Sequence, residues 1–132
     1  MKINDLEMKV SIGYKEIDGP WGGGNNFRIN LSKYLIEKGI SVTNNLRDRN
    51  IDIIILTEPR LSSFSSSYTY REIYYYKKLV NPNVMVIHRI NECDERKNTN
   101  YMNKFLRWSN YCADYTVFIS KWLTSLDIYQ KN

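Results

Sequence analysis

The stretch Asp52-Ile53-Ile54-Ile55-Leu56-Thr57 determines how the rest of the sequence is interpreted. Its unbroken apolar run predicts a strand that is buried on both faces, as in a parallel sheet covered by helices. Pro59 ends this strand, because proline cannot continue a central hydrogen-bonded ladder. Val84-Met85-Val86-Ile87-His88 has the same pattern and predicts a second strand of this kind.

Three further strands and four helices are predicted around these two runs. Residues 8–14 alternate apolar and polar side chains, which is the period of a strand. Thr69 and Glu72 fit a capping box and predict the start of a helix, and Gly39 predicts the end of another. The other strands are predicted at residues 40–43 and 115–119, and the helices between residues 25 and 38 and at 69–79, 99–112 and 121–129.

This alternation of strands and helices indicates the fold class. We predict an α/β domain with a Rossmann-like, doubly wound parallel sheet of about five or more strands and helices on both faces. Residues 1–132 suit one domain with one core, because the chain is short and 42% hydrophobic. A strand order of 3-2-1-4-5 would place the first and fourth strands side by side. Residues 44–51 are too few for a full helix between the second and third strands.

Charge, cysteine content and the lack of long apolar runs limit the kinds of partner, bound metal and membrane contact that the sequence suits. The net charge of +5 and the pI of about 9.2 favour anionic partners, without distinguishing nucleic acid, anionic lipid and phosphorylated small molecules. Cys93 and Cys112 stand far apart beside a single histidine, which argues against a metal site or a disulfide. The sequence lacks an apolar run of roughly 18 residues. We expect no secretory signal, because residues 1–10 contain Asp5 and Glu7 and no apolar stretch. We expect a cytoplasmic protein with at most peripheral membrane contact.

A glycine-rich turn follows the first strand. Gly22, Gly23 and Gly24 permit close approach of the backbone to a ligand, and Asn25 can cap the helix that follows. The free N–H groups and the dipole of a helix N-terminus favour an anion there. The turn is neither a P-loop nor a GxGxxG dinucleotide motif. The alternative interpretation is a flexible surface turn.

Polar residues also stand at the predicted carboxyl ends of the strands, where such folds bind ligands. His88 is interpreted as a contact to a polar substrate, or else as a satisfied histidine at the edge of the core. Arg60 and Arg89 suit a phosphate or carboxylate ligand, or else only solvate the surface. Asn91 and Ser120 follow the fourth and fifth strands.

Aromatic residues are concentrated in the predicted helices. Residues 68–78 mix tyrosine with lysine and arginine, which suits an amphipathic helix with tyrosine in place of leucine or, alternatively, stacking of single-stranded bases. Trp108 and Trp122 are interpreted as packing residues.

Five motifs occur in a fixed order along the chain. They are Pro20-Trp21-Gly22-Gly23-Gly24-Asn25-Asn26-Phe27, Lys38-Gly39, Asp52-Ile53-Ile54-Ile55, His88-Arg89-Ile90-Asn91 and Ala113-Asp114-Tyr115-Thr116-Val117-Phe118-Ile119-Ser120-Lys121-Trp122-Leu123. Together they resemble the N-terminal half of a GT-B glycosyltransferase of the family-4, or group 1, kind. The resemblance spans roughly residues 8 to 125.

The resemblance implies a role for each candidate residue. Gly22, Gly23 and Gly24 would approach the donor diphosphate or the acceptor. His88 matches a family histidine near the transferred sugar and is the catalytic candidate, and Ser120 falls at the floor of the cleft. The reaction would move a sugar from a nucleotide-diphosphate donor to the hydroxyl of an acceptor sugar, lipid or protein, with retention of configuration. The nucleotide-sugar would be a co-substrate, and no other cofactor or metal is expected.

The chain departs from the family pattern in one respect. The Glu-x7-Glu motif of the family's donor-binding half is missing, so we expect that half to lie outside these residues and the domain to be inactive alone. An alternative is a non-enzymatic module or remnant that binds an anionic small molecule or a protein. Nucleic acid is not expected as a partner.

Overall fold

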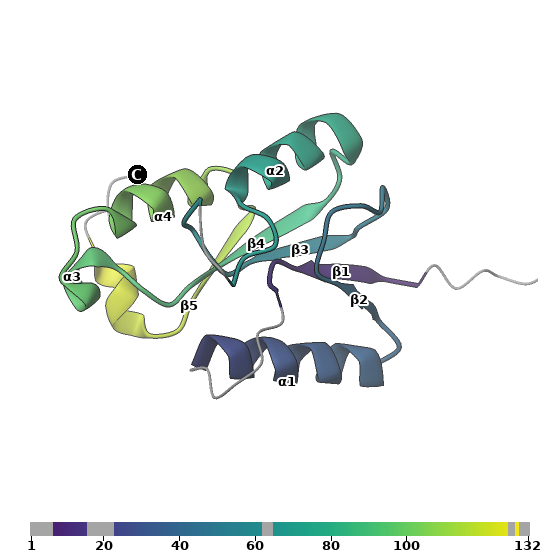
Figure 1. Cartoon of the computed structure of the whole chain (residues 1–132), viewed down its shortest axis with the longest axis horizontal. Helices are drawn as coiled ribbons and strands as arrows, with labels where there is room; N and C mark the ends of the chain where they lie inside the picture. Colours follow the sequence, from purple (N-terminus) through teal and green to yellow (C-terminus); the bar gives the residue numbers. More distant parts are fainter. Residues whose placement is uncertain (1–6, 16–22, 62–64, 127–128, 130–132) are drawn as a thin grey trace, which may run out of the picture.

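The computed structural model describes residues 7–15, 23–61, 65–126 and 129, and it confirms the predicted α/β fold class (Figure 1). Five parallel strands form one sheet, with α1 on one face and α2 and α4 on the other. The strands are β1 (Lys9–Ile12), β2 (Ser41–Thr43), β3 (Ile53–Leu56), β4 (Met85–Ile90) and β5 (Tyr115–Phe118). The helices are α1 (Gly23–Glu37), α2 (Tyr70–Tyr75), the π-helix η1 (Tyr76–Val80), α3 (Asp94–Lys97), α4 (Met102–Asn110) and the 3₁₀-helix η2 (Lys121–Ser125).

The strand order differs from the one assumed from the sequence. The sheet runs β2-β1-β3-β4-β5, so β3 separates β1 from β4. A right-handed crossover through α1 carries the chain to one side of β1, and every later strand is added on the other side. The expectation that β1 and β4 are neighbours is therefore wrong. The topological switch point, at which the order of strands reverses, therefore lies between β1 and β3.

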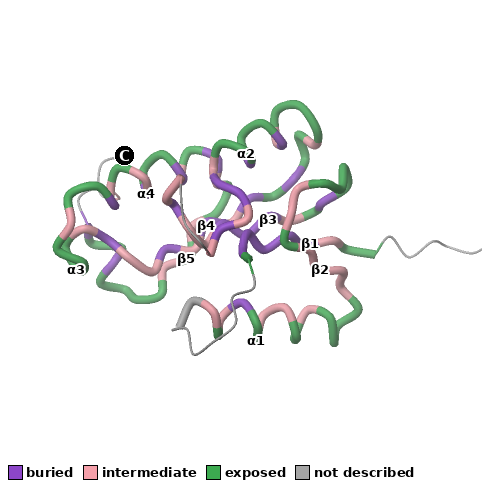
Figure 2. The backbone as a smooth tube through the Cα atoms, viewed as in Figure 1, coloured by how far each residue is buried: buried purple, intermediate pink, exposed green. Residues whose placement is uncertain are grey.

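Side chains of the sheet alternate between two packed layers. Val10, Ile12 and Ile55 pack beneath Leu31 and Leu35 of α1. On the opposite face, a cluster joins β3 and β4 to α2 and η1, and another joins the end of β4 to α4 and η2. Their buried members include Ile54, Leu56, Ile73, Tyr76, Val86, Ile90, Met102, Leu106 and Leu123. Figure 2 shows the burial concentrated in the central strands.

Residues 44–51 take the place of a helix between β2 and β3. The segment crosses the α2 face and is held by hydrogen bonds to side chains of other elements. Ser11 Oγ donates to the Asn45 carbonyl at 2.8 Å. The Tyr76 hydroxyl donates to the Asp48 carbonyl at 2.6 Å and accepts from the Ile51 N–H at 3.1 Å. These bonds satisfy backbone groups that an irregular segment would otherwise bury unpaired.

The predicted helix ends are partly confirmed. Thr69 and Glu72 form the capping box, and Gly39 has a φ of +78°, the left-handed conformation expected after a helix. Asn25 is not a cap, because α1 already begins at Gly23. The short helix α3 lies between β4 and the helix predicted at residues 99–112, where the sequence analysis predicts no helix. Ser120 precedes a 3₁₀-helix that ends at Ser125, and its side chain forms no cap hydrogen bond within the described structure.

Gly13 permits a close contact directly after β1. A Cβ atom at this position would lie 2.6 Å from Cε2 of the buried Tyr68 ring, which is closer than real carbon contacts allow. The Tyr68 hydroxyl and Ser11 Oγ form a hydrogen bond of 2.9 Å beneath the ring. The absence of a side chain at Gly13 thus lets Tyr68 cover the end of β1.

Among the described residues, the α1 face of β5 and of the start of β4 is exposed. Helix α1 covers β1, β2 and β3, and the cluster that it forms does not extend to β5. The residues of β4 and β5 that point to this side include Met85, Tyr115 and Val117, all of which are exposed. The sheet is therefore doubly wound but unevenly covered.

Candidate functional site

Strands are added on one side of β1 and then on the other, and this topological switch point places the candidate site outside the carboxyl ends of β1 and β3. The segments after these two strands are joined there. Thr57 Oγ1 donates to the Gly13 carbonyl at 3.3 Å, and the Lys15 N–H donates to the Ser65 carbonyl at 3.1 Å. The first turns of α1 lie at the same edge (Figure 1). A ligand at this edge would therefore meet residues of several segments that are joined to one another.

Two arginines are brought together on the α1 side of this edge. Arg28 of α1 is buried, and its guanidinium lies 3.2 Å from the centroid of the Tyr14 ring. Arg89 of β4 lies 4.0 Å from the centroid of the Phe27 ring. Burial lowers the pKa of both groups, and the charge of Arg89 lowers the pKa of Arg28 further. Both remain cations, because an arginine pKa lies far above neutrality.

Arg28 is also held by hydrogen bonds. It donates to the Ser65 carbonyl and to Asn25 Oδ1, each at 3.3 Å. Asn25, predicted to bind substrate, therefore orients Arg28 in this structure. The Tyr14 ring and these two oxygens fix the place of this guanidinium, and the negative charge of Glu58 acts on it as well, since it raises the pKa of Arg28.

Arg60, which was predicted with Arg89 to suit a phosphate or carboxylate ligand, already binds a carboxylate of the chain itself. It forms two hydrogen bonds with Glu58, from Nε at 2.8 Å and from an Nη at 2.9 Å. The hydrogen bond to Glu58 raises the pKa of Arg60. A bidentate carboxylate neutralises this guanidinium, so Arg60 contributes little net charge to the edge.

The glycine turn lies only partly within the described residues. Gly22 lies outside them, whereas Gly23 and Gly24 form the first turn of α1. The N–H groups of a first helical turn have no partner within the helix, and the helix dipole adds a partial positive charge. This end of α1 therefore adds to the positive potential of Arg28 and Arg89.

His88 lies inside β4, because the strand continues to Ile90 instead of ending at residue 88. The side chain is fully buried on the α4 face, while Arg89 points to the α1 face. His88 Nδ1 lies 3.2 Å from Asn110 Oδ1, which also accepts a hydrogen bond from Thr116 Oγ1 at 2.7 Å. An amide oxygen only accepts, so Nδ1 carries the proton, and the buried Nε2 has no partner among the described residues. Burial lowers the pKa of His88 to about 4.

Strand order separates the other predicted residues from the switch point. Asn91 follows β4, and its carbonyl accepts a hydrogen bond from Arg96 at 3.1 Å. Ser120 is exposed after β5, the edge strand, with β4 and β3 between it and β1. His88 and the glycine turn do not face one crevice. They are separated by β3, and His88 is directed to the opposite face of the sheet.

The sequence interpretation missed Arg28, Tyr14 and Glu58. Arg28 stands four residues after Gly24, and this spacing places it in the first turns of α1. Its burial results from packing against other elements, so the local sequence does not indicate it. Glu58 stands two residues before Arg60, and this spacing is the signal that could have indicated their pairing.

The described part of the chain contains no group of three or more histidine, cysteine, aspartate or glutamate residues suited to hold a metal ion. Within the same residues, no helix is long and apolar enough to cross a membrane. Comparison of the chain with protein-family models, curated proteins and solved structures finds no match.

Proposed function

We propose that this domain is the N-terminal, Rossmann-like half of a GT-B glycosyltransferase of the group 1 kind. A second half would complete the site, and the joined enzyme would transfer a sugar from a nucleotide-diphosphate donor to an acceptor hydroxyl. The order of the five sequence motifs supports this proposal, and so does the parallel sheet with α1 starting at its carboxyl edge.

The observation that carries the proposal is the pairing of Arg28 and Arg89 beside the first turns of α1. Their like charges raise each other's energy, because each guanidinium lies in the field of the other. Arg89 forms no ion pair among the described residues. An anion placed between the two groups and the helix N-terminus would relieve this repulsion. A diphosphate or a carboxylate has the required charge.

In the reaction, these groups would stabilise negative charge as it develops on the leaving diphosphate. Arg28 is held in place before the ligand arrives, so little reorganisation is needed. His88 is not a contact residue in this proposal, because a fully buried imidazole cannot touch substrate. The donor base and ribose would be held by the second half, as the resemblance implies.

Titration of the 132-residue chain with pyrophosphate and with nucleotide-diphosphate sugars tests the anion site. We expect the amide resonances of Gly23 and Gly24 to shift, and Arg89→Gln to weaken binding roughly tenfold, which is the effect of one charged hydrogen bond. Arg49→Gln is the matched control, since Arg49 is exposed in the connection between β2 and β3. Equal losses in both variants would show that net charge alone attracts the ligand.

Fusion to the C-terminal half of a group 1 glycosyltransferase tests the activity. Sugar transfer to a panel of acceptors, reduced by Arg89→Gln but not by Arg49→Gln, is the expected result. Specific anion binding without transfer in any fusion would refute the enzymatic proposal and identify a binding module.

A further inference from the structure

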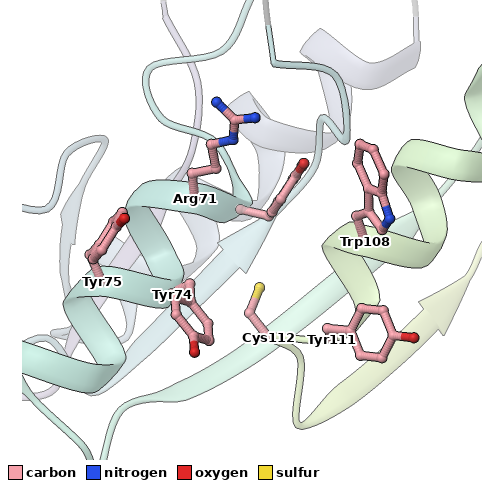
Figure 3. A pocket seen from close by; sticks show the side chains of 7 residues that line it. Arg71, Tyr74, Tyr75, Trp108, Tyr111 and Cys112 are labelled. Carbon is pink, nitrogen blue, oxygen red and sulfur yellow. The ribbon is translucent and has the colours of Figure 1, made fainter.

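A groove lies between α2 and α4. It lies on the face of the sheet opposite α1 (Figure 1). Its volume is about 510 Å³, which is within the usual range for small-ligand sites. Figure 3 shows Tyr74, Trp108, Tyr111 and Cys112 around the gap between the helices. The lining residues are Tyr70, Arg71, Tyr74, Tyr75, Trp108, Tyr111 and Cys112.

The aromatic rings of this groove are unusually accessible. The sequence predicted that tyrosines of residues 68–78 pack in place of leucine; Tyr68 and Tyr76 are buried in this way, whereas Tyr74 is 48% exposed. Tyr111, which directly follows α4, is 80% exposed. Trp108 is 37% exposed, although its ring contacts those of Tyr70 and Phe105. Exposed apolar surface gathered at one place on a protein marks a binding site more often than scattered exposure does. These rings therefore offer flat faces for a ligand to stack on.

The charges around the groove are mostly positive, although Lys77 is paired with Asp114 at 2.6 Å. The segments Tyr70–Tyr75, Tyr76–Val80 and Met102–Asn110 carry five cations and one carboxylate, Glu72. Glu72 is used in the capping box with Thr69. Lys104 lies 4.6 Å from the Trp108 ring centroid, and Lys78 Nζ donates to the Tyr74 hydroxyl at 3.0 Å. Cations stand directly beside the exposed rings.

The side chains that line the groove also narrow the class of ligand. None of the seven is an aspartate, glutamate, asparagine or glutamine. The main hydrogen-bonding groups of the lining are therefore tyrosine hydroxyls, the Trp108 N–H and the Arg71 guanidinium, which lie beside broad aromatic faces. Aromatic faces combined with cations suit bases that stack and phosphates that pair.

We propose that the groove between α2 and α4 binds nucleotides, with the bases stacked on Tyr74, Trp108 and Tyr111 and the phosphates paired with Arg71, Lys78 and Lys104. The nucleotides would be supplied either by a single strand of nucleic acid or as free molecules. The spacing supports the arrangement, because Tyr70 and Tyr74 follow one another at i, i+4 and Trp108 and Tyr111 at i, i+3. Each pair projects from one side of its helix.

The test measures binding of fluorescein-labelled decauridylate to the whole chain by fluorescence anisotropy, with uridine monophosphate as a competitor. Tyr74→Ala and Tyr111→Ala are each expected to weaken binding at least fivefold, the lower end of the effect of one stacked base. Tyr34→Ala is the matched control, because Tyr34 is comparably exposed on α1. Circular dichroism checks that each variant is folded.

Salt dependence and competitors separate the sources and the alternatives. Three phosphate contacts predict a slope of about −2 for the logarithm of affinity against that of salt concentration. Tight binding of decauridylate alone identifies a single strand, and equally tight binding of uridine monophosphate identifies a free nucleotide. Competition by polyglutamate that equals competition by unlabelled decauridylate would overturn the proposal. Binding to phosphatidylserine vesicles without binding to either nucleotide probe would also overturn it. Arg89→Gln is expected to leave this binding unchanged, which separates the result from that of the diphosphate site.

Discussion

Replacing His88 by asparagine should remove a specific part of the pH dependence of stability. The native pKa of His88 is about 4 because burial disfavours the imidazolium, whereas the value in the unfolded chain is near 6.5. Between these two values the unfolded chain binds more protons than the native protein, so stability falls as the pH falls. Each pH unit between them is worth about 1.4 kcal/mol, which gives a total of about 3 kcal/mol.

Urea denaturation at pH 7.5 and pH 5.0 measures this effect. We expect the wild-type chain to lose about 2 kcal/mol more than His88→Asn between these pH values, since the lower one covers most of the interval. Carboxylates titrate in both proteins and cancel in the comparison. Asparagine is the matched variant, because its amide N–H can replace Nδ1–H as the donor to Asn110 Oδ1.

Because His88 is the only histidine in the sequence, NMR reports its titration directly. We expect the imidazole Cε1–H resonance of the folded protein to stay constant from pH 7.5 to pH 5.0. A resonance that titrates near pH 6.5 would refute the reasoning, as would equal losses of stability in the two proteins. Either result would mean that water reaches the imidazole.

Two further substitutions test the local structure. Gly13→Ala should lower the free energy of unfolding by about 1–3 kcal/mol, because the new Cβ would lie 2.6 Å from the Tyr68 ring. Urea denaturation measures this loss. In a Tyr68→Ala background, where the ring is absent, Gly13→Ala should lower the free energy of unfolding much less. Thr69→Ala should cost about 1 kcal/mol, because the capping box at the start of α2 is lost; Thr69→Ser should restore most of it, and an equal loss in both variants by thermal denaturation would show that the cap is not the cause.

The sequence indicated the elements of the fold better than their arrangement. Unbroken apolar runs, the Thr69 capping box and Gly39 are local signals, and the structure confirms the elements that they predict. Strand order is not local, because the same succession of strands and helices is compatible with placing β3 on either side of β1. The structure resolves this through residues 44–51, which cross the α2 face without forming a helix.

The candidate site was less predictable for the same reason. A residue at the end of an apolar run can either leave the sheet or continue it, and β4 continues two residues beyond His88. That extension buries His88 and directs its neighbour Arg89 to the other face. The charge of Arg89 acts on the guanidinium of Arg28, which stands sixty-one positions earlier in the sequence. Only the packing of α1 against the sheet brings the two together.

The uneven cover of the sheet has a consequence for local opening. β5 pairs with a strand on one side only, and its α1 face is exposed, so separating β5 from β4 exposes less new apolar surface than separating β1 from β3. The protein should therefore have a rigid half, which holds the switch point, and a softer half, which holds Ser120 and η2. A ligand that contacts residues beyond β5 would have to order this softer half, and the conformational entropy lost in doing so would weaken its binding.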